Sequence, residues 1–134
     1  NSRRMGQVFL FLSFFTSMVF TNDVSLIIFV PLAISLFKEA HALRLVIPVL
    51  TWMTIAANLG SMLTPIGNPQ NLFIYAHYHL PLAEFLSITA PITALSAVLL
   101  LLASYTLEER PLTLRFAKPT GIPRLRIALL LLLF

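Results

Sequence analysis

Long apolar stretches alternate with short polar clusters along the chain. The apolar stretches run over 5–20, 24–37, 45–78 and 85–107 and begin again at 127, and every charged residue lies outside them. A bilayer core about 30 Å thick needs roughly 20 apolar residues of helix to cross it, and a helix satisfies its own backbone there. The pattern predicts an all-α integral membrane protein.

The first two stretches are too short for a comfortable crossing. At 1.5 Å per residue, 5–20 makes about 24 Å of helix, and 24–37 is shorter still. Basic residues flank both outer ends, which the positive-inside rule places on the cytoplasmic side. We therefore predict a re-entrant helical hairpin over 1–37, with a polar tip at 21–23.

The same rule assigns a side to each later segment, so that all nine Lys and Arg residues lie in the cytoplasm. The expected segments are a cytoplasmic loop at 38–44, an outward span at 45–78, an outside loop at 79–84, an inward span at 85–107, a basic cytoplasmic linker at 108–126 and the start of a further span at 127–134.

The span 45–78 is longer than one crossing, and its middle cannot be regular helix. Two glycines and two prolines fall close together in 60–71, and such residues disfavour helix interiors. We predict a discontinuous helix, whose broken ends expose carbonyls and N–H groups that secondary transporters use for cations and anions. The alternative is a kink whose neutral polar residues only satisfy freed backbone; these residues are Asn58, Ser61, Thr64, Asn68, Gln70 and Asn71.

Asp23 is the one acid expected within the membrane. A charged side chain there costs about 2.5–3.5 kcal/mol even on the translocon scale, so such acids are candidate cation ligands or proton carriers. The alternative is a carboxylate that only stabilises a helix N-terminus through the dipole. Both roles are compatible.

Two polar motifs together resemble a known family. Thr21-Asn22-Asp23-Val24, followed by the polar segment 57–71, is similar to the ion transporter superfamily of citrate transporter-like proteins, arsenite permeases and divalent anion:sodium symporters. The resemblance covers about 5–107. It implies two inverted repeats, each with a re-entrant hairpin and a broken helix whose tips meet at the midplane. The chain starts at Asn1 and ends inside an apolar run, so we expect a fragment that holds the first repeat only.

The resemblance also implies site residues. The tip reads Thr-Asn-Asp, nearer to arsenite permeases than to the Ser-Asn-Thr tip of sodium-coupled dicarboxylate carriers. The expected substrate-binding residues are Asn22, Thr64, Gly67, Asn68 and Asn71. The expected residues for a coupling proton or sodium ion are Thr21, Asp23, Asn58 and Ser61.

The amino-acid composition excludes several classes of function. The chain is 58% hydrophobic and 10% charged, whereas soluble domains carry about 25% charged residues. The net charge of +4 fits basic residues that orient the chain in a membrane, so nucleic acid is excluded as a partner. The chain has no cysteine, which excludes thiol chemistry. We expect no catalytic residues, no metal site and no cofactor beyond the coupling ion.

These inferences converge on a secondary active transporter of an anion, of the citrate or dicarboxylate type or an inorganic oxyanion, coupled to protons or sodium. The alternatives are an arsenite or antimonite efflux permease, a Na⁺/H⁺ antiporter-type member, and an ion channel. The expected location is a prokaryotic inner membrane. The expected partners are the small anionic substrate, the lipid bilayer and the second repeat of the same chain, and association into a homodimer is compatible with the sequence.

Overall fold

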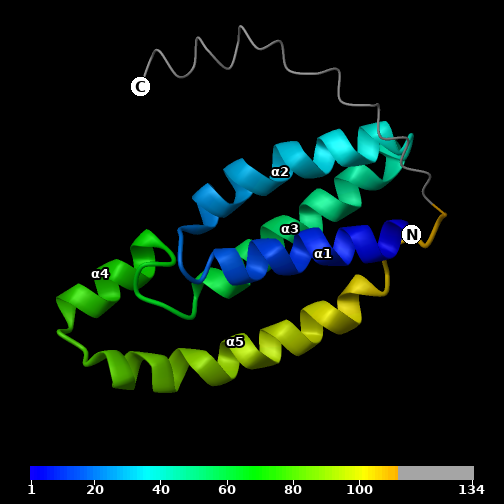
Figure 1. The fold of residues 1–134 in the computed structure, drawn as a ribbon. Coiled ribbons are helices and arrows are strands. Elements are labelled where there is room, and N and C mark those ends of the chain that lie inside the picture. Colours follow the sequence, from blue (N-terminus) through cyan, green and yellow to red (C-terminus); the bar gives the residue numbers. More distant parts are fainter. Residues whose placement is uncertain (112–134) are drawn as a thin grey trace, which may run out of the picture.

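The computed structural model describes residues 1–111, and within them the chain is entirely helical (Figure 1). The helices are α1 (Ser2–Thr16), α2 (Asn22–Glu39), a 3-10 turn (Leu43–Leu45), α3 (Val46–Ser61), α4 (Pro69–His77) and α5 (Leu82–Ser104). An all-α fold was expected from the apolar pattern. The predicted segment 127–134 and most of the linker 108–126 lie outside the described residues.

The first two helices form an antiparallel hairpin. The connecting turn occupies 17–21, because Thr21 is extended and its hydroxyl accepts from the N–H of Val24 at 3.3 Å, as an N-cap does. Asn22 and Asp23, expected in the tip itself, therefore lie in the first turn of α2. The hairpin returns to its starting end (Figure 1); its re-entrant placement in a membrane stays a prediction.

Helix α3 holds the bundle together by contacting α1, α2 and α5. Two apolar clusters fill these contacts, one around Phe9, Phe37 and Met53 and the other around Leu10 and Phe14. The approach of α3 to α1 is closest at Gly60. A Cβ there would collide with the carbonyl oxygen of Phe14 and lie 2.5 Å from Ser17 Oγ. Only glycine allows this contact, which sets the end of α3 against the hairpin turn.

The outer surface of the bundle is strongly apolar. Large side chains such as Ile27, Phe73 and Leu102 are exposed, and the helices over Leu43–Ser61 and Leu82–Ser104 are the two described ones long and apolar enough to cross a membrane. Isolated exposed apolar residues are ordinary, but contiguous apolar faces mark contact with lipid or protein.

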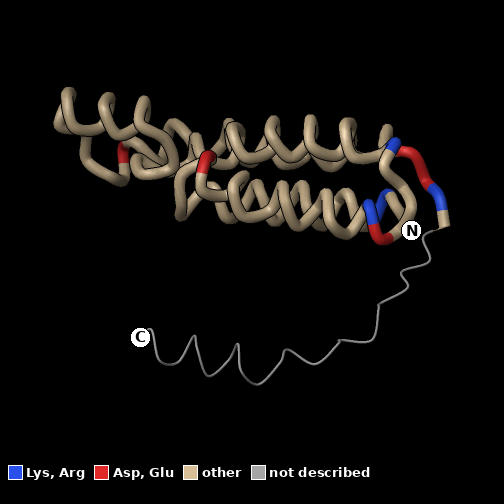
Figure 2. The backbone as a smooth tube through the Cα atoms, turned by 90° about the horizontal axis from the view of Figure 1, so that it is seen from above, with Lys and Arg blue, Asp and Glu red and all other residues tan. Residues whose placement is uncertain are grey.

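The described Lys and Arg residues, in contrast, are confined to one end of the bundle (Figure 2). Figure 2 shows the described Lys and Arg residues gathered at the end of the bundle that holds the N-terminus. We call this the cationic end. The outer ends of α1 and α2 both lie there, as a hairpin with cationic flanks requires. Its assignment to the cytoplasmic side stays a prediction.

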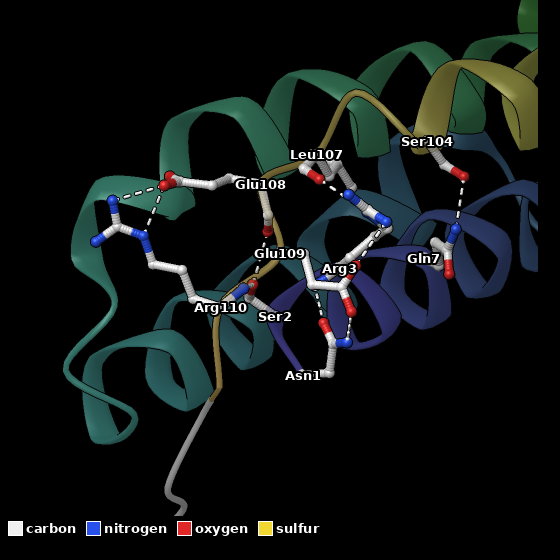
Figure 3. A network of polar contacts seen from close by, with 9 residues as sticks. All are labelled: Asn1, Ser2, Arg3, Gln7, Ser104, Leu107, Glu108, Glu109 and Arg110. Atoms are coloured by element: carbon white, nitrogen blue, oxygen red, sulfur yellow. Dashed lines mark hydrogen bonds and ion pairs between the residues drawn. The ribbon is translucent and has the colours of Figure 1, made fainter.

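A polar clasp closes the cationic end by tying the segment after α5 to the start of α1 (Figure 3). Arg3 forms an ion pair with Glu109 at 2.7 Å, and its Nε donates to the carbonyl of Leu107 at 3.0 Å. Ser2 and Arg110 exchange two further bonds, from Ser2 N to Arg110 O at 3.0 Å and from Arg110 N to Ser2 Oγ at 2.8 Å. These contacts join residues more than a hundred positions apart.

Candidate functional site

The long apolar segment is interrupted between Ser61 and Pro69, inside the expected 60–71. Helix α3 ends there with free carbonyl groups. The Nδ2 atom of Asn71 lies 3.2 Å from the carbonyl oxygen of Ser61, 3.1 Å from that of Met62 and 3.1 Å from that of Thr64. An amide nitrogen has only two hydrogens, so three carbonyls share it. The carbonyl oxygens therefore converge on one point.

Asn68 joins the two half-helices. Its Oδ1 accepts from the N–H of Asn71 at 2.8 Å, which caps α4, while its Nδ2 donates to the carbonyl and hydroxyl oxygens of Ser61 at 3.4 and 3.2 Å. Pro69 occupies the first helical position, where no N–H is needed. Gly67 lies against α3, since a Cβ there would collide with the Ser61 carbonyl.

The hairpin is bonded directly to this break. The N–H of Asn22 donates to the carbonyl of Gly67 at 3.1 Å, and its Nδ2 donates to Asn58 Oδ1 at 3.1 Å. The hydroxyl of Thr64 donates to the carbonyl of Met18 at 2.6 Å. Because Asn22 begins α2 and Gly67 immediately precedes the cap of α4, the N-termini of both helices adjoin. We call this region the polar centre.

One acceptor in the polar centre is unused. The Oδ1 atom of Asn22 is buried and has no hydrogen-bond partner among residues 1–111. The orientation of its amide follows from its neighbours, since Asn58 presents Oδ1 to it and donates its own Nδ2 to the carbonyl of Thr54 at 2.8 Å. Buried polar atoms in native proteins are nearly always paired, so Asn22 Oδ1 is an acceptor that a ligand could use.

The expected coupling-ion residues are not all brought together. Ser61 and Asn58 are linked, through a bond of 2.9 Å from Ser61 Oγ to the Asn58 carbonyl. Thr21 instead uses its hydroxyl to cap α2. Asp23 is exposed in the first turn of α2, and its carboxylate makes no hydrogen bond or ion pair within the described chain. The geometry thus separates Asp23 from the amide network, although Asp23 directly follows Asn22, which belongs to that network.

Thr89 of α5 was not among the residues expected at the site. Its hydroxyl lies 2.9 Å from the carbonyl of Leu63 in the break and 3.1 Å from that of Phe85. The hydroxyls of Thr93 and Ser96, also in α5, bond only to carbonyls of their own helix. The sequence shows only that Thr89 is a hydroxyl residue in an apolar span. Its contact with the break depends on how α5 packs against that segment.

The chemistry of the polar centre is neutral. Amides, hydroxyls and carbonyls dominate it, and the described residues hold no group of three His, Cys, Asp or Glu side chains suited to a metal ion. Helix N-termini attract anions, and converging carbonyls at helix C-termini attract cations. These amides, hydroxyls and carbonyls can donate or accept hydrogen bonds but carry no full charge.

Apolar spans with a polar interruption are typical of membrane transporters. The family comparison agrees: the citrate transporter (CitMHS) family model matches residues 1–134. The chain belongs to the CitMHS citrate transporter family.

Curated relatives are also named as membrane or transport proteins. The chain is 38% identical over 92 residues to the uncharacterized transporter MJ0456 of Methanocaldococcus jannaschii, which covers 63% of this chain and 24% of that protein. It is 39% identical over 102 residues to the inner membrane protein YbiR of Escherichia coli, covering 75% and 26%.

A plant relative is more distant. The silicon efflux transporter LSI3 of rice, Oryza sativa subsp. japonica, is 36% identical over 70 residues, which covers 52% of this chain and 14% of that protein. The chain spans about a quarter of the length of the first two relatives. No solved structure matches it.

Proposed function

We propose that the full-length protein is a secondary active transporter that moves a small anion, either a citrate-like carboxylate or an inorganic oxyanion, coupled to protons or sodium. The observation that carries this proposal is the 3.1 Å bond from Asn22 N to Gly67 O, which brings the N-termini of α2 and α4 together. Membership of the citrate transporter family supports the carboxylate.

Two aligned helix N-termini favour an anion between them. Each terminus carries about half a positive charge through the helix dipole, and discontinuous helices in transporters direct such ends at anionic substrates. Asn22, Asn68 and Asn71 lie at or next to these two N-termini as neutral hydrogen-bonding groups. The Gly67 carbonyl and the Thr64 hydroxyl bond this region to the hairpin. Neutral groups suit a carrier, because a substrate held by full charges would be released slowly.

The coupling ion has two candidate positions. The carbonyls of Ser61, Met62 and Thr64 converge on one point and would suit a sodium ion if Asn71 moved aside. Asp23 is the alternative, since an acid in a membrane can carry a proton. Thr21 caps α2 next to Asp23, and Asn58 of α3 bonds to Asn22 and Ser61.

The names of the relatives bear on the direction of transport and on the cellular location. An inner membrane protein in Escherichia coli supports a prokaryotic inner membrane. A silicon efflux transporter in rice favours the second candidate function, efflux of an inorganic solute such as arsenite. A Na⁺/H⁺ antiporter or an ion channel could also be built from the hairpin and the broken helix. The second repeat of the chain, and a second protomer if the carrier is a dimer, would complete the site.

Reconstituted transport tests the proposal. The full-length protein in proteoliposomes would be given labelled citrate, arsenate or arsenite under an imposed proton or sodium gradient. We expect saturable accumulation of one anion, reduced to background by Asn22→Ala and unchanged by Thr93→Val, whose hydroxyl bonds only within α5. Gradient-driven arsenite export would favour the efflux function. Non-saturating flux would indicate a channel, and flux of no anion would refute the proposal.

A further inference from the structure

A cavity lies at the cationic end, away from the polar centre. It measures about 680 Å³ and is bounded by the connection between α2 and α3 and by the segment after α5. Lys38, His41 and Arg44 line it from the connection, and Arg110 and Pro111 from the segment. His41 turns the chain there with a positive φ of 52°. The volume is within the range of small-molecule sites.

The cations of this cavity are poorly compensated. Arg110 already pairs with Glu108 at 2.6 Å, but Lys38 and Arg44 form no ion pair within residues 1–111, and Glu39 is the one acid in the lining. Residues 112–134 contain no Asp or Glu. The other acids of the cationic end, Glu108 and Glu109, are already paired with Arg110 and Arg3, and Lys38 and Arg44 are both exposed.

The remaining lining is apolar. Ala40 and Leu45 are buried beneath the cations, and Leu43 is exposed beside them. The cavity therefore offers two positive charges above an apolar floor. It lies where the apolar part of α3 begins, which is the level of lipid headgroups for a membrane-spanning helix. Basic pockets at the ends of membrane helices are suited to anionic lipid headgroups.

We propose that this cavity, which we call the basic pocket, binds a phosphate group through Lys38 and Arg44. The group can belong to an anionic phospholipid, whose glycerol and first methylenes would rest on Leu43 and Leu45, or to free phosphate. Arg binds phosphate through a planar fork and Lys through a point charge, so the pair supplies both modes. This site is separate from the transport site and does not depend on the substrate.

Native mass spectrometry of the full-length protein tests the proposal in two arms, one with phosphatidylglycerol and one with inorganic phosphate. Each removed charge is expected to weaken binding about fivefold, since a basic residue near an anionic lipid contributes about 1 kcal/mol. The double variant Lys38→Gln/Arg44→Gln should therefore bind roughly 25-fold more weakly, by the same arithmetic. Tighter phosphatidylglycerol than phosphate binding would identify the lipid as the source.

Matched variants separate a built pocket from general surface charge. Arg4→Gln removes an exposed cation of the same end that does not line the pocket and should leave binding unchanged. The charge-conserving variant Lys38→Arg should also bind as wild type does, which controls for misfolding. Equal binding by the double variant and wild type in both arms would overturn the proposal, as would an equal loss in Arg4→Gln.

Discussion

The polar centre and the cationic end satisfy polar groups by different means. In the polar centre, bonds run between neutral amides or hydroxyls and backbone atoms, as from Asn71 to three carbonyls. At the cationic end, full charges pair, as in Arg3 with Glu109. An unpaired charge is costly inside a membrane and cheap at its surface.

That contrast indicates which contacts should matter. Bonds in the polar centre satisfy backbone groups that the interrupted helix leaves free, and within a membrane, where this region is expected to lie, lipid offers no substitute for them. Ion pairs at the cationic end compete with solvent and are screened by salt. We therefore expect substitutions in the polar centre to be more damaging than chemically similar ones at the cationic end.

The largest effect concerns the two ends of the bundle. With other cysteines removed from the full-length protein, cysteines at Arg4 and His41 should be labelled from the same side, and a cysteine at His79 from the other. All three positions are exposed, so accessibility depends on the membrane alone. Labelling of Arg4 and His41 from opposite sides would refute the re-entrant hairpin.

Matched glycine substitutions compare packing in the two regions. Gly67→Ala should reduce transport to background, because its Cβ would collide with the Ser61 carbonyl and force the half-helices apart. Gly6→Ala should be mild, because its Cβ would meet the side chains of Leu107 and Val49 at 2.9 and 3.2 Å, which can shift. Uptake assays at equal membrane expression would measure both, and active Gly67→Ala protein would show that the close contact is dispensable.

Asp23 can be compared with Glu84, since each is an exposed acid in the first turn of a helix. If Asp23 carries the coupling ion, Asp23→Asn should abolish gradient-driven accumulation but keep part of the exchange of substrate across the membrane. Glu84→Gln should keep both. Accumulation by Asp23→Asn equal to wild type would mean that Asp23 only stabilises the start of α2.

Removing the Asn71 amide should weaken both stability and substrate affinity. Asn71→Ala leaves three carbonyls without their donor, and an unsatisfied buried polar group costs about 1–3 kcal/mol. Gln70→Ala removes an exposed neighbouring amide and should have little effect. Denaturant or thermal unfolding in detergent, together with substrate titration, would measure the difference; equal stability of the two variants would argue against the carbonyl cap.

The smallest effect is expected for the clasp. Arg3→Gln removes the ion pair with Glu109, whose side chain is 51% exposed, and such pairs contribute about 0.2–1 kcal/mol. The loss should shrink further in high salt. Unfolding of Arg3→Gln and Arg4→Gln at low and high ionic strength would compare them, and a salt-independent loss would assign the effect to the Leu107 carbonyl bond instead.

Local sequence signals determined the helices and the interruption of the long apolar segment. Apolar length predicted helices, and Gly67 with Pro69 predicted the interruption, because proline and glycine act on their own backbone wherever they lie. Asn22 of the expected tip and Thr64 of the expected break are joined across the fold, whereas Thr21 and Asp23 of the same tip are not. The family resemblance drawn from those motifs is confirmed by the match over residues 1–134.

The packing of the helices determined which residues distant in sequence became hydrogen-bond partners. The approach of Gly60 to Phe14 sets the depth at which the break meets the hairpin, and so decides that Thr64 reaches the carbonyl of Met18 and Thr89 that of Leu63. It also leaves Asp23 outside the amide network. A motif specifies which donors and acceptors exist, but a hydrogen bond requires its two atoms to lie about 3 Å apart. For residues distant in sequence, only the packing of whole helices sets that separation.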